Sequence, residues 1–393
     1  MTSPQLEIQI IAVLVALACA IPGTFLVLRK MAMISDAISH SILPGIVVGF
    51  FLTHNLSSPW LLFLAAFTGV VTVYLVELIN STKLVKEDAS IGIIFPAFFS
   101  IGVILISRFS GDVHLDTDAV LVGELAFAPF NRLYIHGVDW GPKAIWVMSG
   151  ILLTSLLLLV IFYKELKIST FDKHLAASLG FSPVLIHYGL MTMTSLTTVG
   201  AFDAVGAILV VALIIVPAAT AYLITRSLKT MLLLSSGIGA FSALSGYWLA
   251  HLVDASIGGS MAVVLGGIFF LVFLLEPSRG LISVLLHRRR LKIEYSVLAF
   301  LIHLQSHNRE TEIDEYKVYQ LTGHFNWERR YAQKILKLAA QFAFIRLQGD
   351  TVQLTEQGDR FADNALHYII TNKSDNLTHA HREASLFSLC RKM

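Results

Sequence analysis

Long apolar runs fill most of the first 280 positions, and none of them alternates apolar and polar residues with the period of a strand. Each run is long enough to cross the hydrocarbon core of a bilayer, which takes about 20 helical residues. The pattern predicts nine membrane-spanning helices, at 8–28, 34–54, 58–79, 90–107, 143–163, 184–201, 204–225, 229–252 and 258–276. Between 184 and 225 it also admits a re-entrant segment around Gly200–Asp203.

Composition supports this division between lipid and water. Of 393 residues, 55% are hydrophobic and 14% are charged, against about 25% charged in soluble domains. We expect an all-α polytopic membrane protein followed by a small α+β, winged-helix-like cytoplasmic domain. The predicted parts are a transmembrane domain at 1–280, a basic linker at 281–291, the cytoplasmic domain at 292–370 and a flexible tail at 371–393.

Lysine and arginine gather on one side of the nine-span arrangement. The clusters lie at 29–30, 83–86, 164–173, 226–229 and 279–290. Positive charge in short loops marks the cytoplasmic side. The N-terminus and the connection 110–142 are therefore expected outside the cytoplasmic membrane, with the C-terminal domain inside. The protein would be in contact with membrane lipid over most of its length.

Asp36 and His40 are the sharpest candidates for chemistry, because ionisable groups within a span are unfavourable and usually functional. Four residues apart, they share one face of a helix. A carboxylate oxygen with an imidazole nitrogen suits Mn, Fe or Zn. Two ligands hold a metal poorly, but a two-fold dimer would present two Asp and two His.

A structural interpretation of the same residues stays open. Ser35 and Asp36 would then cap a helix near the interface, and His40 would be a packed, hydrogen-bonded histidine. Small residues around the pair and Pro44 favour a central position over a lipid-facing one.

Two further segments stand out. The run 205–221 ends in Pro217 inside an apolar helix, which indicates a central helix or an ordinary kinked span. The segment 166–183 predicts a short amphipathic helix on the cytoplasmic side, starting at Ser169–Thr170 and stopping at Gly180. Its apolar face comprises Phe171, Leu175 and Leu179, with Asp172 between them. Such a helix rests in the interface or docks a partner.

The sequence contains no G-x-x-x-x-G-K-[ST] motif. ATP-driven transport would thus place ATP hydrolysis on a separate chain, and this chain is not expected to be an enzyme. It contains no H-E-x-x-H either, which argues against an intramembrane metalloprotease.

Four motifs in order resemble the ABC-3 family of metal permeases: MISDAISHSILPGIVVGF, KEDASIGIIFPAFFSIGVIL, FDKHLAASLGFSP and VGAILVVALIIVPAATA. The resemblance covers about residues 8–280. It implies the permease subunit of an ABC-type importer that moves Mn, Zn or Fe as its substrate, with no permanently bound cofactor.

The resemblance also implies partners. These are a second copy or a related permease subunit, an extracytoplasmic metal-binding protein, and ATP-binding subunits docked on the coupling helix that contains Phe171–Gly180. Asp36 and His40 match the family's motif positions for residues lining the path, and Pro217 lies in the matching pathway helix.

The region after residue 291 is additional to such permeases. A hairpin around Gln348–Thr351 followed by LTEQGDRFA resembles the wing of DtxR-type metal-dependent repressors. From Lys292 to Met393 there are 13 Lys and Arg against 12 Asp and Glu, a net charge of +1, whereas DNA binding needs a basic face. We favour a regulatory or docking module, although the basic patch Arg329, Arg330, Lys334 and Lys337 leaves nucleic-acid binding through 292–370 open.

Two other functions compete with the permease. One is a membrane-tethered metal-responsive transcriptional regulator, in which the bundle senses and the C-terminal domain signals. The other is a self-contained secondary transporter that needs no ATPase. The tail residues His379, His381 and Cys390 could bind metal or belong to a disordered end.

Overall fold

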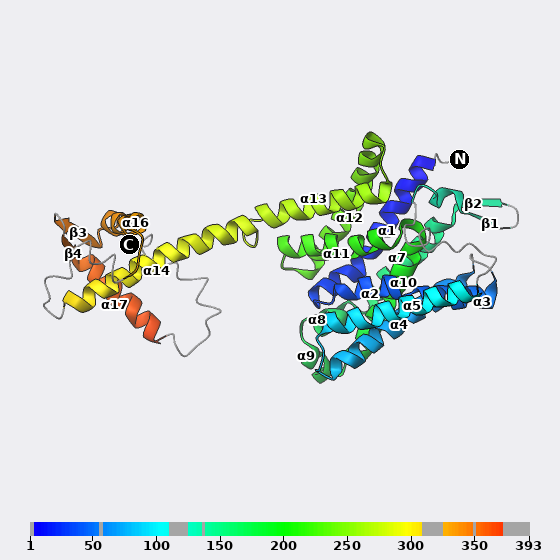
Figure 1. The fold of residues 1–393 in the computed structure, drawn as a ribbon, viewed down its shortest axis with the longest axis horizontal. Coiled ribbons are helices and arrows are strands. Elements are labelled where there is room, and N and C mark those ends of the chain that lie inside the picture. The colour runs from blue at the N-terminus through cyan, green and yellow to red at the C-terminus, as the bar shows by residue number, and fades with distance from the viewer. Residues whose placement is uncertain are drawn as a thin grey trace. The chain divides into compact units, whose positions relative to one another are not determined.

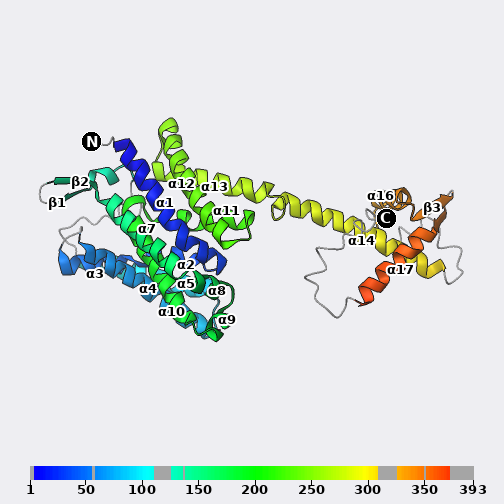
Figure 2. The same cartoon turned by 180° about the vertical axis from the view of Figure 1, so that it is seen from behind.

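A computed structural model describes residues 4–54, 58–109, 125–135, 138–308, 325–348 and 351–371. The chain forms two compact units, Met1–Gly280 and Leu281–Met393. Figures 1 and 2 show the first as a bundle of helices and the second as a smaller group of helices with a hairpin. Each unit is described by itself.

The first unit, the membrane unit, is built from long apolar helices. They are α1 (Pro4–Leu28), α2 (Met33–Ser41), α3 (Leu43–Thr53), α4 (Pro59–Ser81), α5 (Glu87–Phe109), α7 (Lys143–Ile161), α10 (Pro183–Val205), α11 (Ala207–Ile224), α12 (Leu228–Val253) and α13 (Ile257–Leu275). Within the described ranges, eight helical segments are long and apolar enough to span a membrane, with α2 and α3 counted as one.

One of the nine predicted spans, 184–201, corresponds to α10, which is not among those eight. Its 23 residues are helical without interruption through Gly200–Asp203, so the chain does not turn back at those residues. Hydroxyl residues lower its hydropathy, and four of them are fully buried: Thr194, Ser195, Thr197 and Thr198. A buried helix needs less apolar surface than one facing lipid, which explains why the pattern at 184–201 was weak.

Two neighbouring pairs of helices are divided by short breaks. α2 and α3 are separated at Ile42, where Pro44 occupies the first turn of α3. α10 and α11 are separated by Gly206 alone, with φ +79° and ψ +164°. Only glycine adopts that backbone conformation readily, because a Cβ would collide with the chain.

α1 lies at the centre of the bundle, where it contacts α7, α10, α11 and α12. It packs tightly against α11 at Gly23. Pro217 lies inside α11 and is buried. A polar tie also joins α10 to α4, since the Ser195 hydroxyl donates to the Ala66 carbonyl at 2.8 Å.

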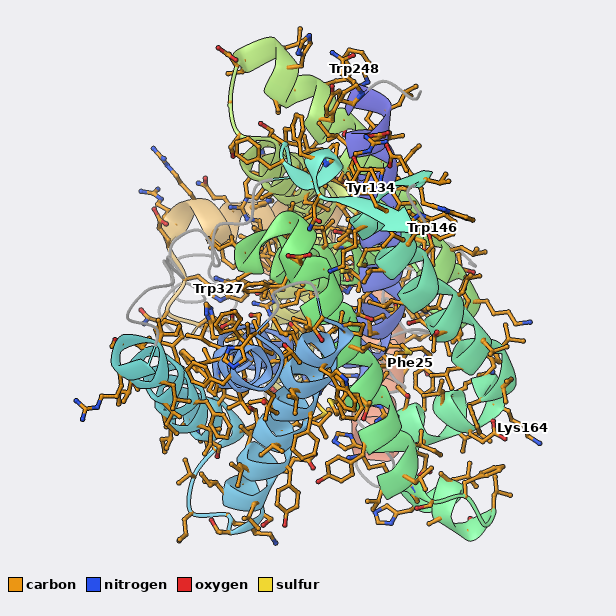
Figure 3. The ribbon with its side chains drawn as sticks, turned by 90° about the vertical axis from the view of Figure 1, so that its right-hand side faces the viewer. Phe25, Tyr134, Trp146, Lys164, Trp248 and Trp327 are labelled. Atoms are coloured by element: carbon orange, nitrogen blue, oxygen red, sulfur yellow. The ribbon has the colours of Figure 1, made fainter. Side chains whose placement is uncertain are left out.

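The two ends of the bundle differ in composition. One end, here called the hairpin end, carries the 3-10 turn η1 (Ala128–Phe130) and the antiparallel strands β1 (Arg132–Ile135) and β2 (Val138–Pro142). In Figure 3, Tyr134, Trp146 and Trp248 lie toward this end and Lys164 toward the other. Exposed tyrosine and tryptophan are typical of a membrane–water interface.

The second unit has its own core. It contains α14 (Leu281–Asn308), α16 (Arg329–Gln341), the strands β3 (Ile345–Gln348) and β4 (Thr351–Leu354), and α17 (Glu356–Thr371). The strands pair antiparallel, Ile345 opposite Leu354. Phe300, Ile335 and Phe344 are buried between these elements.

Several expectations for this unit remain untested. The segment 281–291, expected as a linker, is helical and continuous with the rest of α14. The tip of the hairpin and the tail residues His379, His381 and Cys390 lie outside the described residues. The winged-helix assignment stays a prediction, although a helix, a hairpin and a helix follow one another in the expected order.

Candidate functional site

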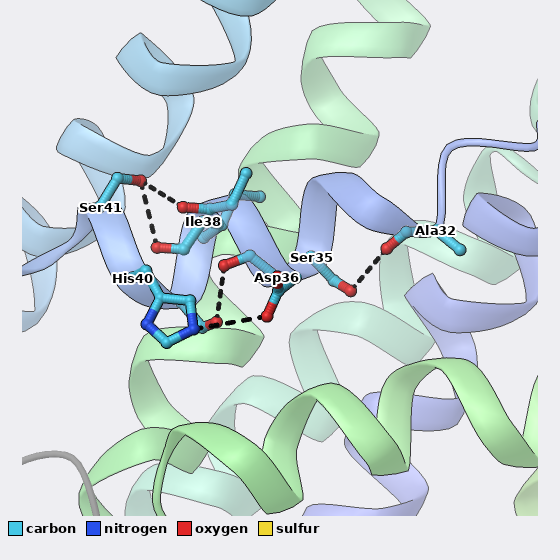
Figure 4. Close-up of polar contacts among 8 residues, drawn as sticks. Ala32, Ser35, Asp36, Ile38, His40 and Ser41 are labelled. Atoms are coloured by element: carbon cyan, nitrogen blue, oxygen red, sulfur yellow. Dashed lines mark hydrogen bonds and ion pairs between the residues drawn. The ribbon is translucent and has the colours of Figure 1, made fainter. Parts of the chain in front are cut away.

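Asp36 and His40 lie on one face of α2, as their spacing predicts. His40 Nε2 is 3.5 Å from Asp36 Oδ1, and the two side chains are 33% and 36% exposed. Figure 4 shows the imidazole turned toward the carboxylate. The helix itself is held by α4, α5, α10 and α11. A carboxylate and an imidazole therefore lie side by side, both partly exposed, on a helix that packs against four others.

The capping interpretation of Ser35 and Asp36 is wrong. The N-cap position of α2 is Ala32, and no side chain caps that end. The Ser35 hydroxyl instead donates to the Ala32 carbonyl at 2.8 Å (Figure 4). Asp36 is thus not engaged by the helix end and is free to pair with His40.

The hydroxyl groups beside the pair do not add to its set of possible metal ligands. The hydroxyls of Ser39 and Ser41 donate to backbone carbonyls of α2, that of Ser39 to Asp36 itself. The ring of Phe95, from α5, lies 5.7 Å from the His40 ring, centroid to centroid. The neighbouring hydroxyls are therefore used inside the helix, and the donors offered to a cation are one carboxylate and one imidazole.

One chain supplies only part of a metal site. Among the residues that the structure describes, no group of three or more His, Cys, Asp or Glu is placed to hold an ion. A stable transition-metal site takes about four protein ligands. Two donors on a half-exposed face can hold a passing ion only with help from water or a second chain.

The amphipathic segment forms two helices instead of one. α8 (Tyr163–Phe171) contains Ser169 and Thr170, so the predicted start at these residues is wrong. The short helix α9 (Lys173–Ser178) begins after Asp172, whose Oδ1 accepts the backbone N–H groups of His174 and Leu175, both at 2.9 Å. A carboxylate cap satisfies two amides that the helix leaves unpaired, which fixes where α9 starts.

The predicted apolar face of this segment is exposed. Phe171, Leu175 and Leu179 are 61%, 49% and 54% accessible. Gly180 follows with φ +86°, the left-handed stop that the sequence indicated. Exposed leucine and phenylalanine beside a capped helix form a surface suited to a partner.

A polar cluster near α9 was not predicted. Arg29, just after α1, places Nη1 3.3 Å from Nδ1 of His187 in α10. The Nε2 atom of His187 lies 2.6 Å from Oε1 of Glu77 in α4, and the Tyr188 hydroxyl donates to Glu77 Oε2 at 2.8 Å. In the sequence, only the positions of Arg29, Glu77 and His187 near the ends of three spans, all on the predicted cytoplasmic side, pointed to this cluster.

Arg29 also reaches the end of α8. Its Nε donates to the Thr170 hydroxyl at 3.2 Å and its Nη2 to Ser169 at 3.5 Å. Burial lowers the pKa of Arg29 to about 10, which still leaves it a cation at neutral pH. We call Arg29, Glu77, Ser169, Thr170, His187 and Tyr188 the four-helix cluster, because α1, α4, α8 and α10 meet there.

Comparison with known proteins identifies the bundle. A family model described as the ABC 3 transport family matches residues 6–276. The chain belongs to the ABC 3 transport family. The match covers the whole membrane unit up to its last helix, and thus includes both α2 and α9. The chain is accordingly a multi-pass membrane permease.

The relatives in the ABC 3 transport family carry names of metal transport systems. The chain is 45% identical to the zinc transport system membrane protein TroD of Treponema pallidum, over 92% of this chain and 98% of TroD. It is 48% identical to the manganese transport system membrane protein MntD of Bacillus subtilis, over 69% of this chain and 92% of MntD. The TroD alignment extends past Gly280 into the second unit.

A solved structure agrees with the fold of the membrane unit. PsaBC from Streptococcus pneumoniae, in complex with Fab, matches with a TM-score of 0.60 and 30% identity, over 71% of this chain and 94% of that chain. The ABC 3 transport fold thus accounts for the membrane unit.

Proposed function

We propose that this ABC 3 permease moves a divalent transition metal ion, Zn or Mn, into the cytoplasm, with Asp36 and His40 lining its path. The observation that carries the proposal is the carboxylate–imidazole pair on the half-exposed face of α2. Oxygen with nitrogen suits both metals and Fe as well. The zinc and manganese systems to which the chain is similar favour the first two.

The missing ligands come from a second permease subunit. A copy of this chain related by a two-fold axis would add another Asp36 and His40, giving two oxygens and two nitrogens around one ion. A related permease would do the same with its own residues. Ligands shared between two subunits separate whenever the subunits move apart, which suits a site that must release its cargo.

The remaining partners bind at opposite ends of the bundle. ATP-binding subunits dock on α9 through Phe171, Leu175 and Leu179. The basic clusters at 29–30 and 164–173 lie at this end, which supports a cytoplasmic position for it. An extracytoplasmic metal-binding protein delivers the ion at the hairpin end. ATP hydrolysis takes place on the separate subunits.

The test is uptake into proteoliposomes that contain the permease with its ATP-binding subunits. Radioactive zinc or manganese should accumulate with ATP and not without it. Asp36→Ala and His40→Ala should each lower uptake by tenfold or more, about 1.4 kcal/mol in effective binding, while the subunits still co-purify. Ser41→Ala is the matched control, since it alters the same helix but removes a hydroxyl bonded only to backbone carbonyls.

Other results would change the assignment. Full uptake by both α2 variants would remove Asp36 and His40 from the path. Uptake that does not need nucleotide would favour a self-contained secondary transporter. No metal uptake under any condition would contradict the proposed function itself.

The second unit serves as a cytoplasmic regulatory or docking module. Its α16 buries Ala332, Ile335 and Ala339 and exposes Arg329, Arg330, Lys334 and Lys337. That basic face is short for a DNA-binding surface, which neutralises several phosphates. The transport names of the relatives favour a permease over a tethered transcriptional regulator.

A further inference from the structure

The four-helix cluster joins parts of the chain that are far apart in sequence. Arg29 bonds to residues 140 and 141 positions away in α8, and to His187, 158 positions away in α10. Tyr188 and Glu77 are 111 positions apart. These separations are far longer than a helix turn, so the contacts form only when the helices of the bundle pack together.

The donors and acceptors in the cluster match. A guanidinium can only donate, so Nδ1 of His187 accepts from Arg29 and Nε2 carries the ring hydrogen toward Glu77. The Nε2–Oε1 contact is short, although the N–H is not well aligned with the oxygen. Glu77 takes the imidazole on one oxygen and the Tyr188 hydroxyl on the other. Both carboxylate oxygens are thereby occupied by α10.

One side of the cluster leads to α9. Ser169 and Thr170 directly precede Phe171 and the Asp172 cap, so Arg29 holds the turn of chain from which α9 starts. Arg29 is bonded in turn to His187 of α10, which contacts Glu77 of α4. Displacement of α9 therefore acts on groups at the ends of α1, α10 and α4.

On its other side, the cluster is connected through α4 and α10 to α2, which carries Asp36 and His40. α4 and α10 both contact α2. At Gly69 of α4 there is no room for even a methyl group, because the Ser195 hydroxyl and Ile38 of α2 already touch it. Ser195 in turn donates to the Ala66 carbonyl. Helices packed this closely move together, and Ile38 lies between Asp36 and His40 on α2.

Resting on the proposed function, we infer that the four-helix cluster transmits movement of the ATPase-docking helix α9 to the helix that carries Asp36 and His40. Glu77, His187 and Arg29 act as positioning residues, since they touch neither the ion nor ATP. A change in the spacing of α8 and α10 at the cluster shifts α4 with them. The face of α2 that carries Asp36 and His40 then opens or closes.

The experiment measures metal uptake and ATP hydrolysis together in the reconstituted complex, and takes their ratio. Glu77→Gln keeps the size of the side chain but removes its charge. It should lower the number of ions moved per ATP by about fivefold or more, the scale of a coupling free energy. Tyr188→Phe removes one hydrogen bond and should lower the ratio less.

The ratio distinguishes transmission from simple damage. A variant that only misfolds loses uptake and hydrolysis in proportion, so its ratio stays at the wild-type value. Asp88→Asn is the control, because it removes a charge at the same end of the bundle from an exposed residue whose side chain has no hydrogen bond or ion pair within the described ranges.

An unchanged ratio in Glu77→Gln would overturn the inference, whatever the absolute rates. If Glu77→Gln yields no complex, the ratio in Tyr188→Phe decides instead, with an unchanged value again counting against transmission. Failure of the wild-type complex to move metal would contradict the proposed function and is seen before any variant is made.

Discussion

Gly23 of α1 lies directly against the backbone carbonyl of Ile214 in α11, one turn before Pro217. Gly23→Ala would push a methyl group into that carbonyl, which cannot yield as a side chain can. We expect a loss of about 1–3 kcal/mol from overpacking, seen as a lower Tm of the purified protein. Gly237→Ala is the control, because its added methyl would meet nothing within 4 Å; an equal Tm for both variants would contradict the prediction.

The exposed leucine of α9 should matter for docking and not for folding. Leu175→Ser is expected to weaken binding of the ATP-binding subunits by about 30-fold, the effect of losing about 2 kcal/mol at an interface centre. Binding is measured by titrating the purified subunits onto the permease in nanodiscs. Leu84→Ser, in the α4–α5 connection, removes a leucine that is still more exposed and should have little effect. Equal losses from both would point to a nonspecific apolar contact.

Acid should loosen the β1–β2 hairpin. Arg132 Nε lies 2.7 Å from Asp139 Oδ2, and this guanidinium, with the Gly141 N–H, lowers the pKa of Asp139. A lowered folded-state pKa stabilises the fold above the unfolded value of about 3.9, and that stability is lost as the pH falls through the folded value.

Tryptophan fluorescence can follow that loss, because Trp140 adjoins Asp139 and its carbonyl accepts from the Trp146 indole. The signal should change below about pH 4 in the wild type. Asp139→Asn, which cannot titrate, should lack that transition. A transition of the same size in both proteins would assign it to other carboxylates.

Removing the second unit should leave transport intact. A chain that ends before residue 292 keeps every helix of the membrane unit and α9. ATP-dependent uptake in proteoliposomes should stay within about twofold of the full-length value. Complete loss of uptake by a truncated chain that still assembles would make the second unit part of the transport machinery.

Local patterns predicted the parts of the site that depend on local geometry. The four-residue spacing of Asp36 and His40 put them on one helix face, and Gly180 ended α9, because helix periodicity and backbone conformation are set within a few residues. The start of α9 was wrong for a related reason. Ser169 and Thr170 are good capping residues, but their hydroxyls are engaged by Arg29, and Asp172 caps the helix instead.

The four-helix cluster could not be predicted from one sequence. Arg29, Glu77 and His187 sit at the ends of three different helices, and each alone is an ordinary interfacial residue. Their pairing depends on how the bundle packs. The span at α10 was likewise the least apolar in the sequence, because most of its serine and threonine hydroxyls are buried inside the protein.

The junction between α10 and α11 is a place where the chain should not tolerate the insertion of residues. Gly206 is the whole connection. One added residue there would turn the following helix by about 100° and shift it by about 1.5 Å. That turn would carry Pro217 and the contact with Gly23 out of alignment. Insertions should therefore be accepted in the loops at the hairpin end long before they are accepted at residue 206.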